Sequence, residues 1–145
     1  MKPLILSLAS FLCLLMASNC YATELSIPEA TILLEAENQG FNGMVAIGEV
    51  IRIRARERHQ SFDDVCLARL QFSCWNSKGY AYKRLSRASK KSLDMARRAW
   101  AESANSNLTR KANHYFNPRL ANPKWARNMR VMAEIGQHKF LTDKK

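Results

Sequence analysis

Apolar residues that recur every three or four positions predict helices along the first half of the chain. Ser26–Glu29 ("SIPE") has the form of a capping box and would open a helix through 30–38, "ATILLEAEN". After a turn at 39–43, Asn42 would cap a second helix over 43–58, "GMVAIGEVIRIRARER". In that helix the arginines would face water, and the residues that would face the core are Val45, Ile47, Val50 and Ile51.

The middle of the chain predicts a short helix and then a longer one. Ser61–Asp64 ("SFDD") can cap a short helix over 65–70, "VCLARL". From Ser86 to about Ser103, the spacing of Leu93, Ala96 and Trp100 predicts an amphipathic helix.

The last third of the chain changes to short segments. The stretch 122–127, "NPKWAR", indicates a turn or short helix, and 130–141, "RVMAEIGQHKFL", a hairpin that turns at Gly136–Gln137. The hairpin could pair with 113–116, "NHYF". These patterns predict a mainly helical α+β domain with a small antiparallel sheet near the C-terminus.

The first 22 residues have the pattern of a secretory signal peptide. Lys2 precedes an apolar run over 4–16, and small residues near Ala22 suit cleavage after that position. The alternatives are a retained anchor, for which the run is short against the roughly 20 residues of a full span, or a slowly released one. We therefore expect a secreted or periplasmic protein whose residues 23–145 form one domain.

The charge balance indicates an anionic partner. The net charge is +11, and only one cation, Lys2, lies in the signal segment. For an exported protein, an anionic cell wall surface is a better candidate than nucleic acid. The alternative is that the scattered arginines and lysines are ordinary solvated helix surface.

Two cysteines, Cys66 and Cys74, would remain after cleavage. In an oxidising compartment two cysteines so close in sequence are expected to form a disulfide, although two buried free thiols are the alternative. Neither Cys-x-x-Cys nor histidine-rich spacing is present. We therefore expect no structural zinc and no cofactor.

Glu35 is the candidate for acid chemistry. It follows Ile32, Leu33 and Leu34 near the end of the first predicted helix, just before the turn. Apolar surroundings favour the neutral form of a carboxyl group, which suits a general acid. A surface glutamate paired with a lysine or arginine is the alternative.

Five segments in order resemble the SleB/CwlJ cell wall hydrolase family, the spore-cortex-lytic enzymes and their relatives. They are "LLEAENQGFNGMVAIGEVIRIRAR", "VCLARLQFSCWN", "KANHYFNP", "NPKWA" and "IGQHKF". The resemblance implies a lysozyme-like domain over 23–145 that cuts the glycan strands of peptidoglycan. It also places Glu35 at the family's catalytic glutamate and Gly43 at its turn glycine. The arginine, glycine and second glutamate of the family's E-A-R-G-E motif are here Glu37, Asn38 and Gln39.

The segment "QFSCW" (71–75) is expected to form part of a saccharide groove. If it is extended, Gln71, Ser73 and Trp75 share one side, where they could bind sugar hydroxyls, amides and ring faces, while Phe72 and Cys74 face the other. Gln39 could also bind a sugar or position a water. Trp75 could instead simply be packed in the core.

A second wall of the groove is expected from His114, Tyr115 and Asn117, with Trp125 and His138 behind it. Either histidine could equally have a structural role, because a lone histidine is more often structural than catalytic. His59, at a helix end, is expected on the surface.

Three functions are compatible with these residues. The first is a monomeric lytic transglycosylase that cuts the MurNAc-GlcNAc β-1,4 bond with Glu35 alone and leaves 1,6-anhydromuramyl ends. The second is a zinc-dependent N-acetylmuramoyl-L-alanine amidase that uses His114 and His138. The third is a non-catalytic module that binds the wall or nucleic acid.

Overall fold

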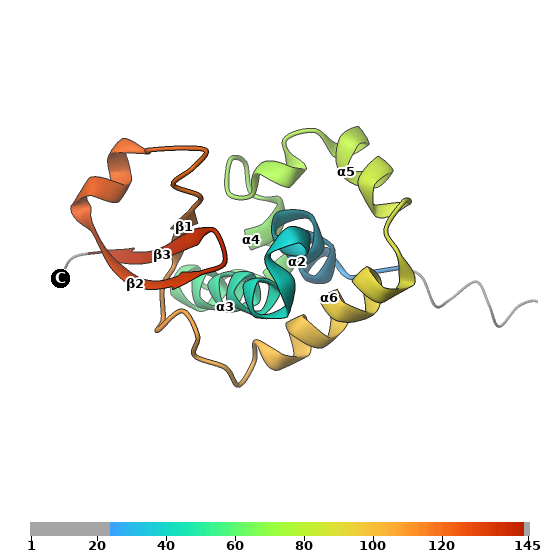
Figure 1. Ribbon diagram of the computed structural model, residues 1–145, viewed down its shortest axis with the longest axis horizontal. Helices are drawn as coiled ribbons and strands as arrows, with labels where there is room; N and C mark the ends of the chain where they lie inside the picture. The colour runs from blue at the N-terminus through green and yellow to red at the C-terminus, as the bar shows by residue number, and fades with distance from the viewer. Residues whose placement is uncertain (1–23, 144–145) are drawn as a thin grey trace, which may run out of the picture.

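The computed structural model describes residues 24–143, in which packed helices adjoin a small antiparallel sheet (Figure 1). This is the mainly helical α+β fold that the sequence predicts. The predicted signal peptide, 1–22, lies outside the described residues. Between residues 24 and 143, no helix is both long enough and apolar enough to cross a membrane.

The helical part is built around α2 (Ile27–Ala36), α3 (Gly40–Arg58) and α6 (Lys90–Glu102). The capping box opens α2 as predicted, because the Ser26 N–H donates to the Glu29 carboxylate at 2.8 Å. The core that these helices share includes the fully buried Ile32, Leu33, Met44, Ile47 and Ile51. Burying each such side chain contributes about 1.5 to 3 kcal/mol, so this core holds α2 in place against α3 and α6.

Helix α3 differs from its prediction in two ways. It begins at Gly40, so Asn42 lies inside its first turn and is not its N-cap. Its arginines do not all face water: Arg54 is only 6% exposed and donates from Nε to the Asn113 carbonyl at 2.7 Å. The half-buried Arg52 lies 3.6 Å from the ring centre of Trp100. Carbonyl and aromatic partners make this burial possible.

Between α3 and α6 the structure has an earlier short helix than predicted and one helix that was not predicted. Ser61 caps α4 (Phe62–Leu67) as expected, accepting from the Asp64 N–H at 3.1 Å. The short 3₁₀ turn η3 (Ser73–Trp75) and helix α5 (Lys78–Leu85) follow, and the sequence did not predict α5. Consequently α6 starts only at Lys90, with Ser89 as its N-cap.

A buried carboxylate in α3 fixes the loop that leads from α6 to the sheet. Glu49 accepts from the hydroxyls of Ser106 and Thr109 and from the N–H groups of Leu108 and Thr109, at distances between 2.5 and 2.8 Å. These contacts join residues 57 to 60 positions apart. They position the chain just before the first strand.

The sheet confirms the predicted hairpin and its third strand. Its order is β1 (His114–Phe116), β3 (His138–Asp143), β2 (Met129–Ile135), all antiparallel. The hairpin turns at Gly136, whose φ of 60° favours glycine. In β1, Tyr115 lies opposite Phe140 of β3. The predicted short helix after β1 is the 3₁₀ segment η4 (Lys124–Asn128).

Candidate active site

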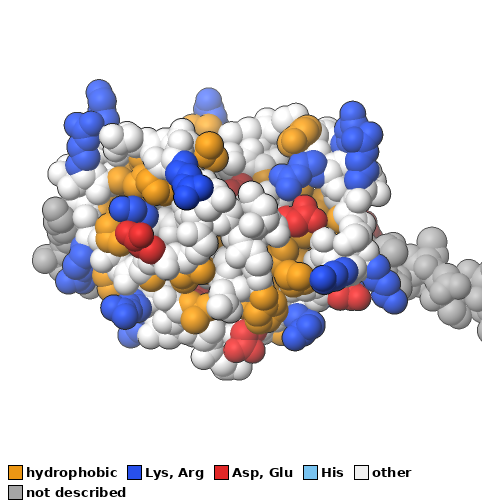
Figure 2. All heavy atoms as spheres, viewed as in Figure 1, with side chains coloured by type: hydrophobic (Ala, Val, Ile, Leu, Met, Phe, Trp, Pro, Cys, Tyr) orange, Lys and Arg blue, Asp and Glu red, His pale blue; other side chains and the backbone are white. Residues whose placement is uncertain are grey.

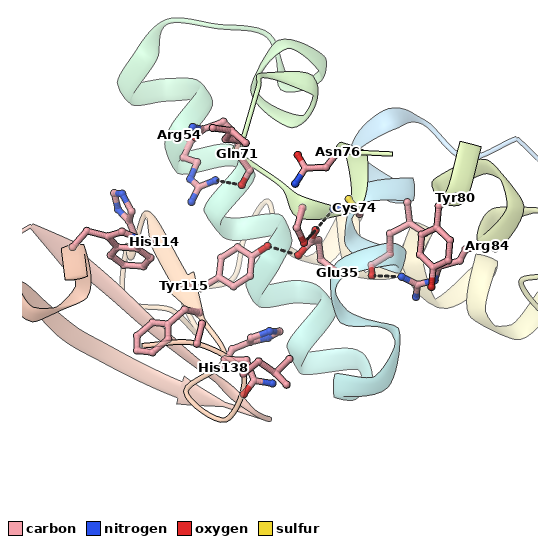
Figure 3. Close-up of a pocket in the computed structure, with 18 of the residues that line it drawn as sticks. Glu35, Arg54, Gln71, Cys74, Asn76, Tyr80, Arg84, His114, Tyr115 and His138 are labelled. Atoms are coloured by element: carbon pink, nitrogen blue, oxygen red, sulfur yellow. Dashed lines mark hydrogen bonds between the residues drawn. The ribbon is translucent and has the colours of Figure 1, made fainter. Parts of the chain in front are cut away.

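A cleft of about 910 Å³ lies between two walls. The sheet and the loop that follows β1 form one wall, and η3 and α5 form the other. Figure 3 shows Glu35 between Cys74 on one side and Tyr115 on the other. Glu35 lies in the last turn of α2, so the buried core of that helix holds it in place. Residues of both predicted walls meet here, including Gln71, Ser73, His114, Tyr115 and Asn117.

The Glu35 carboxylate accepts three hydrogen bonds. Its Oε1 accepts from the Cys74 backbone N–H at 2.9 Å and from the Ser73 hydroxyl at 3.3 Å. Its Oε2 accepts from the Tyr115 hydroxyl at 2.8 Å. The Glu35 side chain is half-buried and lines the cleft. Because its three donors belong to η3 and β1, two elements other than its own helix, they fix the orientation of the carboxylate.

Two titratable side chains beside Glu35, those of Tyr115 and Cys74, are neutral. Burial raises the pKa of Tyr115 well above its ordinary value, and the charge and hydrogen bond of Glu35 add to the shift. Burial and the same carboxylate also raise the pKa of the Cys74 thiol. Tyr115 therefore stays protonated at neutral pH and serves as a hydrogen-bond donor.

Among the described residues that line the cleft, Glu35 is the only carboxylate. Glu37 does not line the cleft: its Oε2 lies 3.7 Å from Nη2 of Arg84, a cleft residue whose Nη1 donates to the Leu34 carbonyl at 2.9 Å. The pairing expected of a surface glutamate thus belongs to Glu37 and not to Glu35. The site offers one carboxyl group for acid and base chemistry.

Gln39 does not line the cleft, although the sequence suggested that it could bind a sugar. Its Oε1 accepts from the Gln137 N–H at 2.7 Å, and its Nε2 donates to the Asn38 side chain at 2.8 Å. Gln39 therefore joins the turn after α2 to the β2–β3 hairpin. It is a structural link beside the site.

The segment 71–75 is only partly as predicted. Gln71 and Ser73 line the cleft, but the Ser73–Trp75 turn is 3₁₀ and not extended, so the expected alternation fails. Trp75 is 8% exposed and donates from Nε1 to the Thr31 hydroxyl at 2.9 Å. Trp75 is thus a core residue and not a sugar platform, whereas Phe72 is buried as expected.

On the sheet side, the two histidines have different surroundings. His114 bonds through Nδ1 to the Asn113 side chain at 2.7 Å, and its ring lies 5.4 Å from that of Trp125. His138 is 8% exposed, lies 5.2 Å from the Tyr115 ring, and its buried Nδ1 has no hydrogen-bond partner among the described residues. Burial lowers the pKa of both, so both are neutral at neutral pH. The third residue of this wall, Asn117, donates to the Gln137 side chain at 3.1 Å.

Several cleft residues were not found from the sequence. Tyr80 and Leu120 are 61% and 84% exposed, and Leu70 and Asn76 also line the cleft. Exposed apolar side chains in a cleft suit the apolar faces of sugar rings. Tyr80 belongs to α5, which the periodicity did not reveal, so no signal pointed to it.

The predicted disulfide is not formed, because Cys66 and Cys74 are free thiols. Cys66 is buried in the core from α4, where burial raises its pKa to about 11 and Thr31 is its hydrogen-bond partner. Cys74 lies instead against Glu35. The two sulfur atoms have different partners, and the prediction of a bridge was wrong.

No metal-binding group was found in the described part of the chain, where no three His, Cys, Asp or Glu side chains are gathered to hold an ion. His114 pairs with Leu141 and His138 with Ile135, so the histidines stand at different positions along the sheet. The amidase alternative therefore has no assembled zinc site among residues 24–143.

Comparisons with known proteins give the family and the fold. Residues 38–141 match the family model described as Cell Wall Hydrolase. The catalytic domain of the germination-specific lytic transglycosylase SleB from Bacillus anthracis has a similar structure, with a TM-score of 0.68 and 22% identity over 86% of this chain and 98% of that one. The SleB catalytic domain of Bacillus cereus gives a TM-score of 0.57 and 20% identity, covering 82% and 93%. No match was found among the curated proteins.

Proposed function

The chain belongs to the cell wall hydrolase family, and from this premise we propose that it is a lytic transglycosylase that cleaves the MurNAc-GlcNAc β-1,4 bond of peptidoglycan. The single carboxylate of the cleft carries the proposal. Ordinary glycosidases use two carboxyl groups, one as acid and one as nucleophile or base. A cleft with one carboxyl group suits a reaction in which the substrate supplies its own nucleophile.

In the first half of the reaction, protonated Glu35 donates its proton to the glycosidic oxygen as the bond to the muramyl anomeric carbon breaks. The leaving GlcNAc gains that proton and departs as an alcohol. Tyr115, Ser73 and the Cys74 N–H hold the carboxyl group in place as it loses the proton, because all three donate to it. General acid catalysis of this kind contributes about 10²- to 10⁴-fold in rate.

In the second half, the Glu35 carboxylate removes the proton from the muramyl 6-hydroxyl while that oxygen attacks the anomeric carbon. The new bond closes a 1,6-anhydro ring, and Glu35 regains the proton that it gave. No water is consumed. Neutral Tyr115 and Cys74 suit this step, since neither places a second negative charge beside the carboxylate.

The walls of the cleft support a glycan substrate. Tyr80 and Leu120 expose apolar surface for sugar rings, while Gln71, Asn76 and Asn117 supply amide groups for hydroxyls and acetamido groups. Residues with these properties stand on both sides of Glu35, which suits a strand that passes through the cleft and is cut within it.

Product analysis with a matched pair of variants tests the proposal. We expect wild-type protein to release 1,6-anhydromuramyl products from purified peptidoglycan, as detected by mass spectrometry. Glu35→Gln should lose at least about 10²-fold in rate while it still folds and binds sacculi. Glu37→Gln, two positions away and outside the cleft, should keep most activity. Reducing-end muramic acid as the main product, or an active Glu35→Gln protein, would contradict the mechanism.

Export is part of the proposal and is supported by the sequence of residues 1–22 alone. A periplasmic or secreted location brings the enzyme to its substrate. The scattered Lys and Arg side chains visible in Figure 2 would assist attraction to the anionic wall. N-terminal sequencing of the exported protein should begin at Thr23, and an intact N-terminus would argue against cleavage.

A further inference from the structure

Arg54 is a buried cation that has no carboxylate partner. Its Nε and Nη1 donate only to neutral carbonyls, those of Asn113 at 2.7 Å and Gln71 at 3.4 Å. No ion pair joins it to another described residue, and neither of its two hydrogen bonds uses Nη2. The charge of Glu35 acts on Arg54 and raises its pKa, but burial is the largest effect and lowers it, and Glu35 accepts no hydrogen bond from Arg54. A buried cation without a hydrogen-bonded anion is costly, so an anion from outside the protein would be stabilised beside it.

Arg58 extends this cation toward solvent. It lies one helical turn after Arg54 in α3, is exposed, and lines the same cleft. It forms no ion pair with another described residue. The two charges are close enough that Arg58 adds to the lowering of the Arg54 pKa, although burial is the larger cause.

The third arginine of the cleft is already occupied. Arg84 holds the Leu34 carbonyl and lies near Glu37, as described above. In Figure 3, Glu35 and Tyr115 lie between Arg54 and Arg84. Positive charge that is free for a ligand is thus concentrated at the Arg54 end of the cleft. His114 lies near this end: burial lowers its pKa most, and the charge of Arg54 lowers it further.

We propose that Arg54 and Arg58 form a carboxylate-binding subsite of the cleft, so that the enzyme selects glycan strands that carry carboxylates. Guanidinium groups bind carboxylates through paired, charge-assisted hydrogen bonds. In peptidoglycan this carboxylate comes either from the lactyl group of a muramyl residue or from its stem peptide. The inference builds on the proposed function and adds the substrate class.

The experiment compares four substrates from one peptidoglycan preparation. Strands with stem peptides and strands freed of peptides by an amidase, which leaves lactyl carboxylates, are each used directly and after conversion of their carboxyl groups to neutral methylamides. The kcat/KM for strand cleavage is measured for wild type, Arg58→Gln and Arg54→Gln. Arg56→Gln is the control, because Arg56 is exposed on the same helix but does not line the cleft.

We expect methylamidation to lower wild-type kcat/KM about tenfold, in line with the loss of a charge-assisted hydrogen bond. Arg58→Gln should lose about fivefold to tenfold on carboxylate strands and nothing further on methylamidated strands, while Arg56→Gln matches wild type throughout. Arg54→Gln removes a buried packing group and could lower stability, so the melting temperature of this variant is measured first. Arg58 is exposed, so Arg58→Gln is the variant that tests the subsite. A loss on peptide-free strands assigns the lactyl carboxylate, and a loss only on peptide-bearing strands assigns the stem peptide.

Equal wild-type rates on native and methylamidated strands, or the same Arg58→Gln loss on both, would overturn the subsite. These results are distinct from failure of the proposed function, in which wild type releases no 1,6-anhydromuramyl product from any of the four substrates.

Discussion

The hydroxyl of Tyr115 donates to Oε2 of Glu35 at 2.8 Å, joining the middle of β1 to the last turn of α2 across 80 positions of the chain. Tyr115 is itself held by ring stacking on Phe140, 5.8 Å away in β3. The orientation of the carboxyl group thus depends on the sheet as well as on its own helix. This is why a small sheet far along the sequence belongs to the site.

Removing this hydroxyl should lower turnover without unfolding the protein. In Tyr115→Phe the ring can keep its stacking on Phe140, while Glu35 loses one of three donors. We expect kcat to fall about 10-fold, with KM changed less than about twofold, because the bond acts on the reacting group and not on the bound sugars. Steady-state kinetics on soluble glycan strands measures both values.

Tyr82→Phe is the matched control, since Tyr82 is exposed and packs on Trp75 outside the cleft. It should behave like wild type. A Tyr115→Phe protein with full kcat would show that two donors are sufficient to orient Glu35.

The free Cys66 thiol should make stability depend on alkaline pH. Burial raises its pKa from 9.0 to about 11 in the folded protein, so between these values the folded state binds more protons than the unfolded state. Stability therefore falls as pH rises from about 9 to 11, by roughly 2 to 3 kcal/mol from this group. Urea unfolding at a series of pH values measures it.

The Cys66→Ala protein lacks this contribution and should lose less stability over the same pH range, although it is less stable at pH 8 because of the cavity. Parallel curves for the two proteins would count against a free buried thiol. Thiol titration of unreduced, denatured protein should also find both Cys66 and Cys74 free.

Local sequence patterns predicted the elements whose signals are local. The Ser26 and Ser61 caps, the end of α3 at Arg58 and the hairpin at Gly136 each depend on a few neighbouring residues, and all were correct. Helix α5 was missed because only Ala81 of its residues is fully buried, so it has almost no apolar stripe.

The site was predicted less completely because its contacts are long-range. Glu35, Ser73 and Tyr115 were each candidates, but nothing local indicates that the second and third donate to the first. Arg54 was misassigned, and the choice between groove and core was left open for Trp75, for the same reason. Their partners, Asn113 and Thr31, lie 59 and 44 positions away, and such tertiary contacts override the preference of arginine for solvent.

The buried Glu49 should be important for stability. In Glu49→Gln an NH2 group replaces one of the two carboxylate oxygens. This group is a donor and cannot accept from the donors of the loop at Ser106–Thr109, so hydrogen bonds to that loop are lost. We expect a loss of about 2 to 4 kcal/mol in the free energy of unfolding. Glu57→Gln, which removes an exposed carboxylate from the same helix, should cost less than about 1 kcal/mol. Equal losses in chemical denaturation would refute the role assigned to Glu49.

The position of Gln39 gives the sharpest test of a mechanism with one carboxyl group. Gln39→Glu restores the glutamate of the family motif, and its carboxylate can still accept from the Gln137 N–H, so the hairpin link is retained. Because position 39 does not line the cleft, the new carboxylate should not act as a second base. We expect kcat within about threefold of wild type and an unchanged proportion of 1,6-anhydromuramyl product.

Gln39→Ala, which breaks the link, should lower the melting temperature and reduce kcat more than Gln39→Glu does. A shift of Gln39→Glu products toward reducing-end muramic acid would mean that this position reaches the reacting sugar, and Glu35 would then not act alone.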